Sequence, residues 1–147
     1  KAFIIKQIKK MKKKRILVDM SATIIHHGHI RLLKKANKFG IVVVALTKDS
    51  EIKREKGYIP ELDFKSRKEI LSSIKYVNEV IPSNFIINEK FLKKNKIDFL
   101  IHGHDNVNKI NDKKKIKIFP RTKGISSSLL RKKTIKSLRQ IKKFKKN

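Results

Sequence analysis

The chain has 147 residues, enough for one domain with a buried core, and it lacks cysteine, which excludes a disulfide scaffold and thiolate metal sites. Its net charge of +28 is typical of nucleic-acid-binding proteins. However, 33 of the 40 basic residues are lysine and only 7 are arginine. Lysine, isoleucine and asparagine have A/T-rich codons, so a base-composition bias explains much of the charge. We therefore expect weak, salt-dependent binding of polyanions and no specific nucleic-acid partner.

No stretch approaches the roughly 20 apolar residues that a membrane span needs, so we expect no membrane span. The opening run, residues 1–6, is too short for the core of a signal peptide. We therefore expect a cytoplasmic protein. Residues 1–14 form a basic N-terminal extension in this interpretation, with Met11 as a candidate native start.

The first half of the chain predicts two strands and two helices. Residues 15–20 are a short apolar run typical of a buried strand, and the following helix, about 28–38, ends at a Phe-Gly pair. Residues 41–47 are apolar and β-branched throughout, which suits a parallel strand buried on both faces. A charged loop is expected over 48–62, and an amphipathic helix over about 63–76.

The second half continues the alternation of strands and helices. Strands are expected at 80–82, 99–102 and, as an exposed edge, 116–119, with a short helix at 89–95 and a basic helix from 126 to about 143. This order predicts an α/β, Rossmann-like open parallel sheet of about five strands with helices on both faces. In such sheets ligands bind at the carboxyl ends of the strands, where the strand order reverses.

All five histidines fall in two clusters, within residues 26–29 and 102–104, and each cluster follows a predicted strand. The first cluster reads H-x-G-H and opens a helix. Gly28 allows close approach of the backbone, the helix N-terminus offers free N–H groups, and imidazoles add donors, so the pattern favours a phosphate site. Metal binding by His26 and His29 is the alternative, which the glycine and the strand-loop-helix context disfavour. His27 is expected at the surface.

The run 18–29, V-D-M-S-A-T-I-I-H-H-G-H, resembles the first signature of the cytidylyltransferase-type nucleotidyltransferases. The run 121–128, R-T-K-G-I-S-S-S, is similar to their second signature. Further matches fall between them in the family's order, at 56–57, 64–67, 76–80 and 102–105. The resemblance covers about residues 15–131, which we take as the nucleotidyltransferase domain, and leaves 132–147 as a basic C-terminal helix or tail. The basic run from Arg131 to Lys146 is most simply a solvated helix face, with contact to nucleic acid or an acidic membrane as the alternative.

The resemblance implies the HxGH nucleotidyltransferase fold and transfer of CMP from CTP to a small phosphate or phosphonate compound, with release of pyrophosphate. Glycerol-3-phosphate and phosphoethanolamine enzymes are the most similar, and the wording D-M-S-A also resembles 2-aminoethylphosphonate enzymes. Mg²⁺ and a homodimer are implied in the same way, and no residue is assigned to a metal. The resemblance assigns catalysis to His26, His29, Lys56 and Arg121, and nucleotide binding to Met20, Ser21, Ala22, Gly28, Arg67, His102, Gly103, Asp105, Thr122, Gly124, Ile125, Ser126 and Ser127.

Several of these residues, and two of their neighbours, also have a plain structural interpretation. Lys56 is one of 33 lysines and lies in a loop that we expect to be flexible and solvated. Ser126 suits an ordinary N-cap of the last helix. Asp105 and His104 suit polar positions of a loop, and Asp19 suits a cap of the turn after the first strand.

The chain also departs from the family pattern. Thr23 stands where the family usually has Asp, Met20 where many members have Gly, and Asn78 where Asp is common. Two alternatives therefore stay open. One is an ATP-using adenylyltransferase of the same fold, and the other is a catalytically weakened module that binds a nucleotide or nucleic acid.

Overall fold

The fold is a five-stranded, all-parallel sheet with the strand order β3-β2-β1-β4-β5. The computed structural model describes residues 13–103 and 105–145, so the extension at 1–12, Met11 and His104 lie outside the described residues. The strands are β1 (Arg15–Met20), β2 (Ile41–Thr47), β3 (Glu79–Ser83), β4 (Phe99–Gly103) and β5 (Ile116–Phe119). The helices are α2 (His27–Asn37), α3 (Asp49–Lys56), α4 (Phe64–Ser72), α5 (Glu89–Lys94) and α6 (Ser127–Phe144), with a short 3₁₀ turn at Lys113–Lys115.

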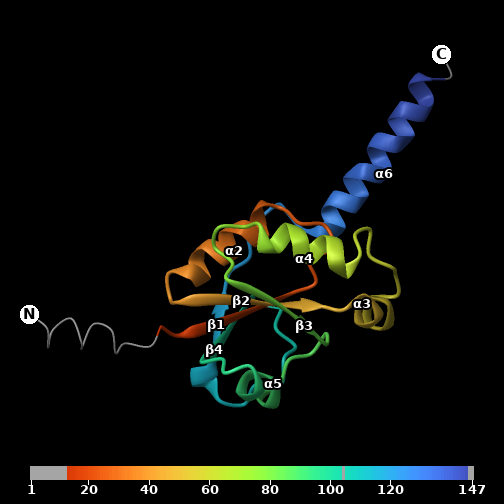
Figure 1. Ribbon diagram of the computed structural model, residues 1–147. Coiled ribbons are helices and arrows are strands. Elements are labelled where there is room, and N and C mark those ends of the chain that lie inside the picture. The colour runs from red at the N-terminus through yellow and green to blue at the C-terminus, as the bar shows by residue number, and fades with distance from the viewer. Residues whose placement is uncertain (1–12, 104, 146–147) are drawn as a thin grey trace, which may run out of the picture.

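The predicted layers are confirmed, because helices cover both faces of the sheet (Figure 1). Successive strand residues point to opposite faces. In β1, Ile16 and Val18 pack under α2 and α4, while Leu17 faces α5. Strand β2, which lies between β3 and β1, is buried along almost its whole length, as its apolar sequence predicted.

The expectation of an unstructured loop over 48–62 was wrong in its first half, because α3 spans Asp49–Lys56. Ile52 is fully buried, so one apolar residue is enough to dock this short helix. Its ends complement the helix dipole, with acids in the first turn and bases in the last. Gly57 ends it in the left-handed conformation, with φ +75°.

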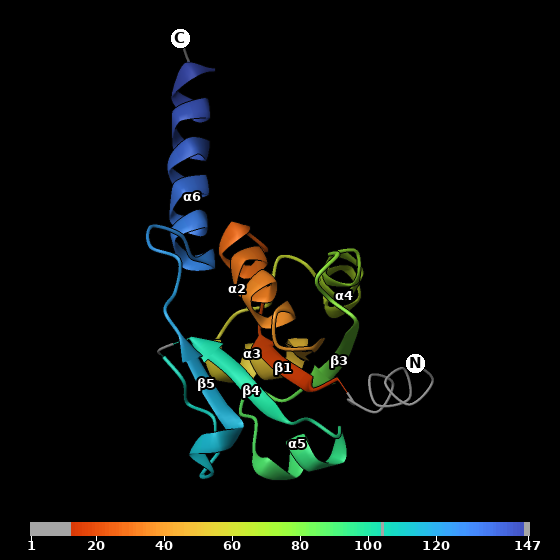
Figure 2. The ribbon, with the colours of Figure 1, turned by 90° about the vertical axis from the view of Figure 1, so that its left-hand side faces the viewer.

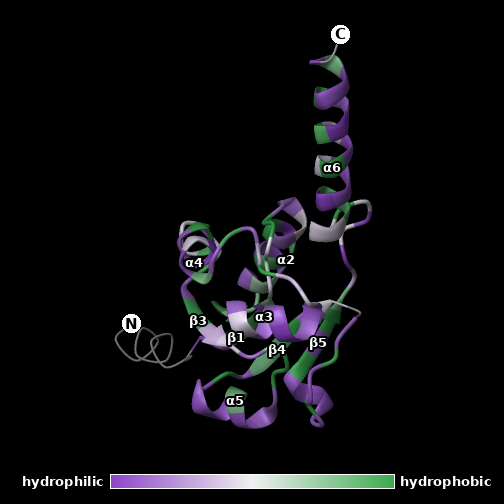
Figure 3. Ribbon diagram, turned by 90° about the vertical axis from the view of Figure 1, so that its right-hand side faces the viewer, coloured by the Kyte–Doolittle hydropathy of each residue, from purple (hydrophilic) through white to green (hydrophobic). Residues whose placement is uncertain are grey.

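Helix α4 is shorter than the predicted 63–76 and ends at Ser72. The Ser73 N–H bonds three carbonyls of the last turn, and its hydroxyl donates to the Glu69 carbonyl at 2.9 Å, which tightens and closes the helix. Helix α6 begins beside the body and then projects away from it (Figures 1 and 2). Basic residues dominate its surface, interrupted by exposed apolar positions (Figure 3).

The ion pairs seen among residues 13–103 and 105–145 take their cations from arginine and histidine. Arg15 at the start of β1 pairs with Glu79 of β3 at 2.8 Å, for example. Lysine contributes to none of them. No helix of these residues is long and apolar enough to cross a membrane.

The sheet topology sets where a ligand can bind. The strand order reverses at β1, because β2 lies on one side of it and β4 on the other. The segment after β1 and the segment after β4 therefore diverge above this edge of the sheet. The first histidine cluster follows β1, and His102 lies near the end of β4.

Candidate active site

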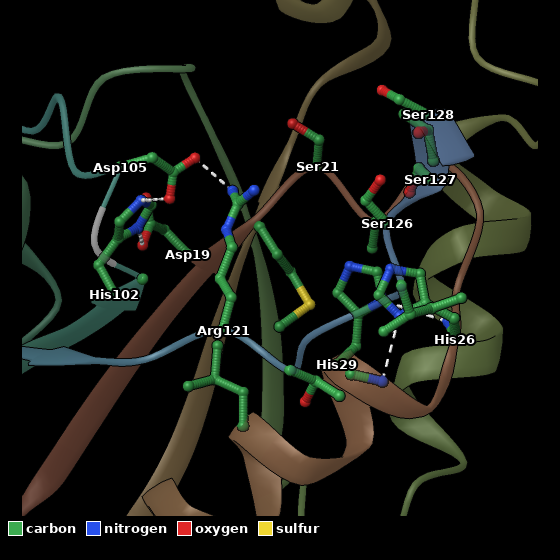
Figure 4. A pocket seen from close by; sticks show the side chains of 18 of the residues that line it. Asp19, Ser21, His26, His29, His102, Asp105, Arg121, Ser126, Ser127 and Ser128 are labelled. Atoms are coloured by element: carbon green, nitrogen blue, oxygen red, sulfur yellow. Dashed lines mark hydrogen bonds and ion pairs between the residues drawn. The ribbon is translucent and has the colours of Figure 1, made fainter. Parts of the chain in front are cut away.

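A cavity of about 580 Å³ opens at the carboxyl ends of β1 and β4, within the size range of small-molecule sites. The segment after β1 and the first turns of α2 form one wall. Three further parts of the chain complete the wall. They are the end of α3 with Tyr58, the segment after β4, and the stretch from the end of β5 into α6. Figure 4 shows His26, His29 and Ser126 on one side of the cavity and His102 and Asp105 on the other.

His26 and His29 cap the N-terminus of α2 reciprocally. The Gly28 N–H donates to Nδ1 of His26 at 3.1 Å, and the His26 N–H donates to Nδ1 of His29 at 3.2 Å. Each Nδ1 is therefore an acceptor, which leaves the proton of each neutral ring on Nε2. Gly28 is required here because a Cβ at this position would lie 2.8 Å from the His26 ring. The motif thus builds two Nε2–H donors at the N-terminus of α2.

Both rings stay neutral at physiological pH. Burial lowers the pKa of His29 to about 3, helped by the neighbouring His26. Burial also lowers the pKa of His26, with further contributions from His27 and Arg121. The two imidazoles can therefore donate hydrogen bonds to phosphate oxygens without carrying charge themselves. His27 is exposed and does not line the cavity.

The second signature reaches the cavity between β5 and α6. Arg121, Thr122, Ile125 and Ser127 line it, as does Ser126. The Ser126 hydroxyl accepts from the Leu129 N–H at 3.1 Å, so this residue is the N-cap of α6 as well as a cavity residue. The Ser127 hydroxyl donates to the Ile24 carbonyl at 3.1 Å, which ties the start of α6 to the segment before the H-x-G-H motif. Two helix N-termini thus converge on the cavity.

The far wall carries an ionised group of side chains. Nδ1 of His102 lies 2.5 Å from Oδ1 of Asp19, and its Nε2 lies 3.6 Å from Asp105. Asp105 also pairs with Arg121. Gly103 leaves room for this pair, because a Cβ there would lie 3.0 Å from Oδ1 of Asp105. Asp19 thus binds His102, and the expectation that it caps the turn after β1 was wrong.

Arg67 lies outside the cavity, with its side chain fully buried beneath it. Its guanidinium donates to the Ser21 carbonyl at 2.5 Å, the Thr47 carbonyl at 2.9 Å and the Asp49 carboxylate at 2.6 Å. Through these bonds it joins the ends of β1 and β2 to α3. Arg67 therefore positions Ser21, which does line the cavity, together with its neighbours Met20 and Ala22.

The remaining residues assigned from the signatures also fall into those that line the cavity and those that do not. Lys56 lines the cavity from the last turn of α3, a helix where a flexible loop was expected. Gly124 does not line it and instead turns the chain, with φ +75°, before α6. All the other residues assigned from the signatures line the cavity: Met20, Ser21, Ala22, His26, Gly28, His29, His102, Gly103, Asp105, Arg121, Thr122, Ile125, Ser126 and Ser127.

Sequence reasoning missed a cluster at the mouth of the cavity. Arg131 of α6 pairs with Glu61, donates to the Thr23 hydroxyl at 2.7 Å and lies over the Tyr58 ring. The sequence predicted a solvated basic face for Arg131, because many of the residues that follow it are also basic. Its signal was its residue type, since it is one of only seven arginines.

The cavity residues that the structure describes do not form a metal-ligating set. Among the described residues, no three histidine, aspartate or glutamate side chains are grouped closely enough to hold an ion. The two carboxylates of the cavity wall already bind cationic partners, Asp19 through His102 and Asp105 through Arg121. We therefore derive no step through a metal held by this chain.

Comparisons with known proteins identify the family of this chain. The family described as "Cytidylyltransferase-like" matches residues 21–133. The chain is 34% identical over 125 residues to a glycerol-3-phosphate cytidylyltransferase of Staphylococcus aureus, covering 80% of this chain and 92% of that protein. It is 34% identical over 104 residues to an ethanolamine-phosphate cytidylyltransferase of Arabidopsis thaliana, covering 67% of this chain and 24% of that protein. A lipopolysaccharide core biosynthesis protein from Thermoplasma volcanium superposes with a TM-score of 0.62 at 26% identity, covering 74% of this chain and 98% of that chain.

Proposed function

The chain belongs to the cytidylyltransferase-like family, and on this premise we propose that it transfers CMP from CTP to a small phosphate or phosphonate compound and releases pyrophosphate. It is a nucleotidyltransferase of the cytidylyltransferase type. The observation that carries the proposal is the pair of neutral imidazoles at the N-terminus of α2, facing a cavity that a second helix N-terminus also meets.

The chemistry needs positioning and charge stabilisation. An oxygen of the acceptor phosphate attacks the α-phosphorus of CTP, and the bond from that phosphorus to the bridging oxygen of pyrophosphate breaks. Because the attacking oxygen is already an anion, no protein nucleophile is needed. The protein must hold two anions together and stabilise the charge that builds on the α-phosphate.

In this proposal His26 and His29 donate from Nε2 to oxygens of the α-phosphate. Arg121, beside the N-terminus of α6, binds the outgoing β- and γ-phosphates. The Ser126 and Ser127 hydroxyls lie at the same helix terminus, and Lys56 reaches the anions from the end of α3. Support for these roles comes from the position of each side chain in the cavity wall.

Mg²⁺ belongs to this proposal as a companion of the substrate. Because the described residues offer no ligand set, the triphosphate oxygens themselves would hold the ion and bring it into the cavity. It would neutralise charge on the departing pyrophosphate. A homodimer and a cytoplasmic location stay predictions, which sedimentation analysis and cell fractionation test.

The test is pyrophosphate release with Mg²⁺ and either CTP or ATP. The acceptors are glycerol 3-phosphate, phosphoethanolamine, phosphocholine and 2-aminoethylphosphonate. We expect turnover with CTP and one acceptor, a loss of about 10²–10³-fold in kcat for His29→Ala, and no loss for the exposed His27→Ala. Turnover with ATP alone would replace the proposal with the adenylyltransferase alternative.

Thr23 favours a second candidate, a member of the family with weakened catalysis. Its buried hydroxyl stands at the family's usual aspartate position and accepts from Arg131. That candidate predicts CTP binding without pyrophosphate release, and recovery of release in Thr23→Asp. Binding of RNA that survives His26→Ala, without any CTP binding, would instead favour a nucleic-acid module.

A further inference from the structure

Four charged side chains run along the far wall of the cavity in an unbroken line. Strands β1 and β4 are paired with Val18 opposite Ile101, so Asp19 and His102 are neighbours one residue further on. Both continue the face of the sheet that Leu17 and Leu100 share. The register of two core strands therefore fixes the contact between this carboxylate and this imidazole.

The carboxylate end of the line is anchored on both oxygens. Oδ1 of Asp19 accepts from Nδ1 of His102 at 2.5 Å, and Oδ2 accepts from the amide of Asn108 at 2.8 Å. The Asp19 side chain is 9% exposed and the His102 side chain is 17% exposed. A carboxylate so placed, with two donors and little water, has one orientation available to it.

The contacts on the two ring nitrogens of His102 favour its protonated form. Nδ1 donates to Asp19, and Nε2 faces the carboxylate of Asp105 at 3.6 Å. A neutral ring with its proton on Nδ1 would turn a lone pair toward that second carboxylate. Burial, the largest single influence, lowers the pKa of His102, and Arg121 lowers it slightly. The bond to Asp19 and the charges of Asp19 and Asp105 outweigh both and raise the pKa above its usual 6.5.

The line ends on Arg121, a residue that our proposed function places against the β- and γ-phosphates. Its guanidinium pairs with Asp105. Two carboxylates and two cations thus alternate, and their formal charges cancel. If His102 loses its proton, a net negative charge faces the incoming triphosphate, and Asp105 loses one of its two cationic neighbours.

We propose that Asp19 is a positioning residue of the transfer reaction: by holding His102 as a cation in one orientation, it fixes Asp105 and through it the Arg121 guanidinium that meets the phosphates. This inference rests on the proposed function for the role of Arg121. The arrangement of Asp19, His102 and Asp105 itself is independent of which nucleotide binds.

The first experiment measures the charge of His102 without any substrate. The imidazole Cε1–H resonances of the full chain are followed by NMR as a function of pH, and the His102 signal is identified by its loss in His102→Gln. We expect the Asp19→Asn variant to lower the pKa of His102 by about one unit or more. Asp112→Asn, which removes a carboxylate that caps the distant 3₁₀ turn, should leave it unchanged.

The second experiment measures the pH profile of kcat/KM for CTP. Asp19, Asp105 and Arg121 are the charged groups facing His102 from β1, from the segment after β4 and from the segment after β5. In the wild type, activity should fall on the alkaline side as His102 loses its proton. In Asp19→Asn, that alkaline limb should move to lower pH by the same shift that NMR gives, which a general loss of stability would not produce.

The outcomes separate this inference from the proposed function. An unchanged His102 titration in Asp19→Asn, or a loss of activity by the same factor at every pH, would overturn the positioning role. If Asp19→Asn lowers the pKa of His102 but the wild type turns over no CTP, the contact is correct and the assigned reaction is wrong. If Asp19→Asn does not fold, Asp19→Ser takes its place in both measurements, with the same expected shift and the same overturning result.

Discussion

The guanidinium carbon of Arg131 lies 4.4 Å from the centre of the Tyr58 ring. The two residues come from different segments that line the cavity, Arg131 from α6 and Tyr58 from the segment after α3. Glu61 pairs with the same guanidinium, and the Thr23 hydroxyl accepts from it. Four residues thus join the first turns of α6, the segment after α3 and the segment after β1.

This cluster predicts how the chain responds to an aspartate at position 23. Thr23 is 1% exposed, so Thr23→Val leaves the Arg131 N–H without an acceptor and should lower the free energy of unfolding by about 1 kcal/mol. Thr23→Asp should be tolerated, because Arg131 supplies the opposite charge. The measurement is urea unfolding of each variant.

The double variant Thr23→Asp with Arg131→Gln is the control for that prediction. It leaves a buried carboxylate without its cation, so its loss should exceed the sum of the single variants by about 3 kcal/mol. Additive losses would show that Arg131 does not compensate a charge at position 23.

Arg67 should be the most costly arginine to replace. Arg67→Met removes the donors to the partly buried Ser21 carbonyl and the buried Thr47 carbonyl, and leaves the Asp49 carboxylate without its cation. We expect a loss of about 3–5 kcal/mol in the free energy of unfolding, measured with urea. The matched control is Arg139→Met on the exposed part of α6, whose loss should be small. Equal losses would contradict a structural role for Arg67.

Comparing Lys56 with Lys53 distinguishes an effect at the cavity from an effect of charge elsewhere on α3. Both lie in its last turn, but only Lys56 lines the cavity. Lys56→Ala should lower kcat/KM for CTP by roughly 10–100-fold, because it removes a cation near the phosphates. Lys53→Ala should leave it unchanged. The same loss in both would attribute the effect to general surface charge.

The buried His29 predicts that stability falls in mild acid. Its folded-state pKa is depressed from 6.5 to about 3, so between these values the unfolded chain binds a proton that the folded chain does not. The free energy of unfolding should therefore decrease as pH falls below 6.5. His26, whose pKa is also lowered, adds to the slope. Because carboxylates titrate mostly below about 4.5, unfolding curves between pH 6.5 and 4.5 isolate the histidines.

His29→Asn is the variant that checks this origin. Its amide oxygen can accept the His26 N–H in place of Nδ1 but does not titrate, so the slope should flatten. His27→Asn, at an exposed position, should keep the wild-type slope. A slope that persists in His29→Asn would assign the acid sensitivity to other groups.

The sequence predicted the strands well because their apolar runs are short, β-branched and separated by clear breaks. It did not predict α3, because Ile52 is the one buried apolar residue of that helix and the charged residues around it hide the 3.6-residue period. The acids at its start, the bases at its end and the following Gly57 were a readable helix signal. A loop was expected because the segment lacks apolar periodicity, although these residues at its two ends are typical of a helix.

In the candidate site, too, some features could be predicted from the sequence and others could not. Residues that line the cavity from contiguous signatures, such as His26 and Ser126, could be placed there from the sequence alone. The contacts of Arg67, Asp19 and Arg131 could not, because each joins segments far apart in the chain. Arg67 lies 46 positions from Ser21, and Arg131 lies 108 from Thr23. Such partners follow from the strand order, which one sequence does not reveal.

Arginine and lysine have separate roles in this protein. Among the described side chains, the ion pairs that join β1 to β3, α4 to α3 and α6 to the cavity mouth all use arginine. Lysine supplies most of the positive charge but none of these pairs. The long-range electrostatic field of the molecule and the contacts that shape its cavity therefore depend on different residues. Evolution or a protein engineer can retune the field by exchanging surface lysines while the framework of the site stays intact.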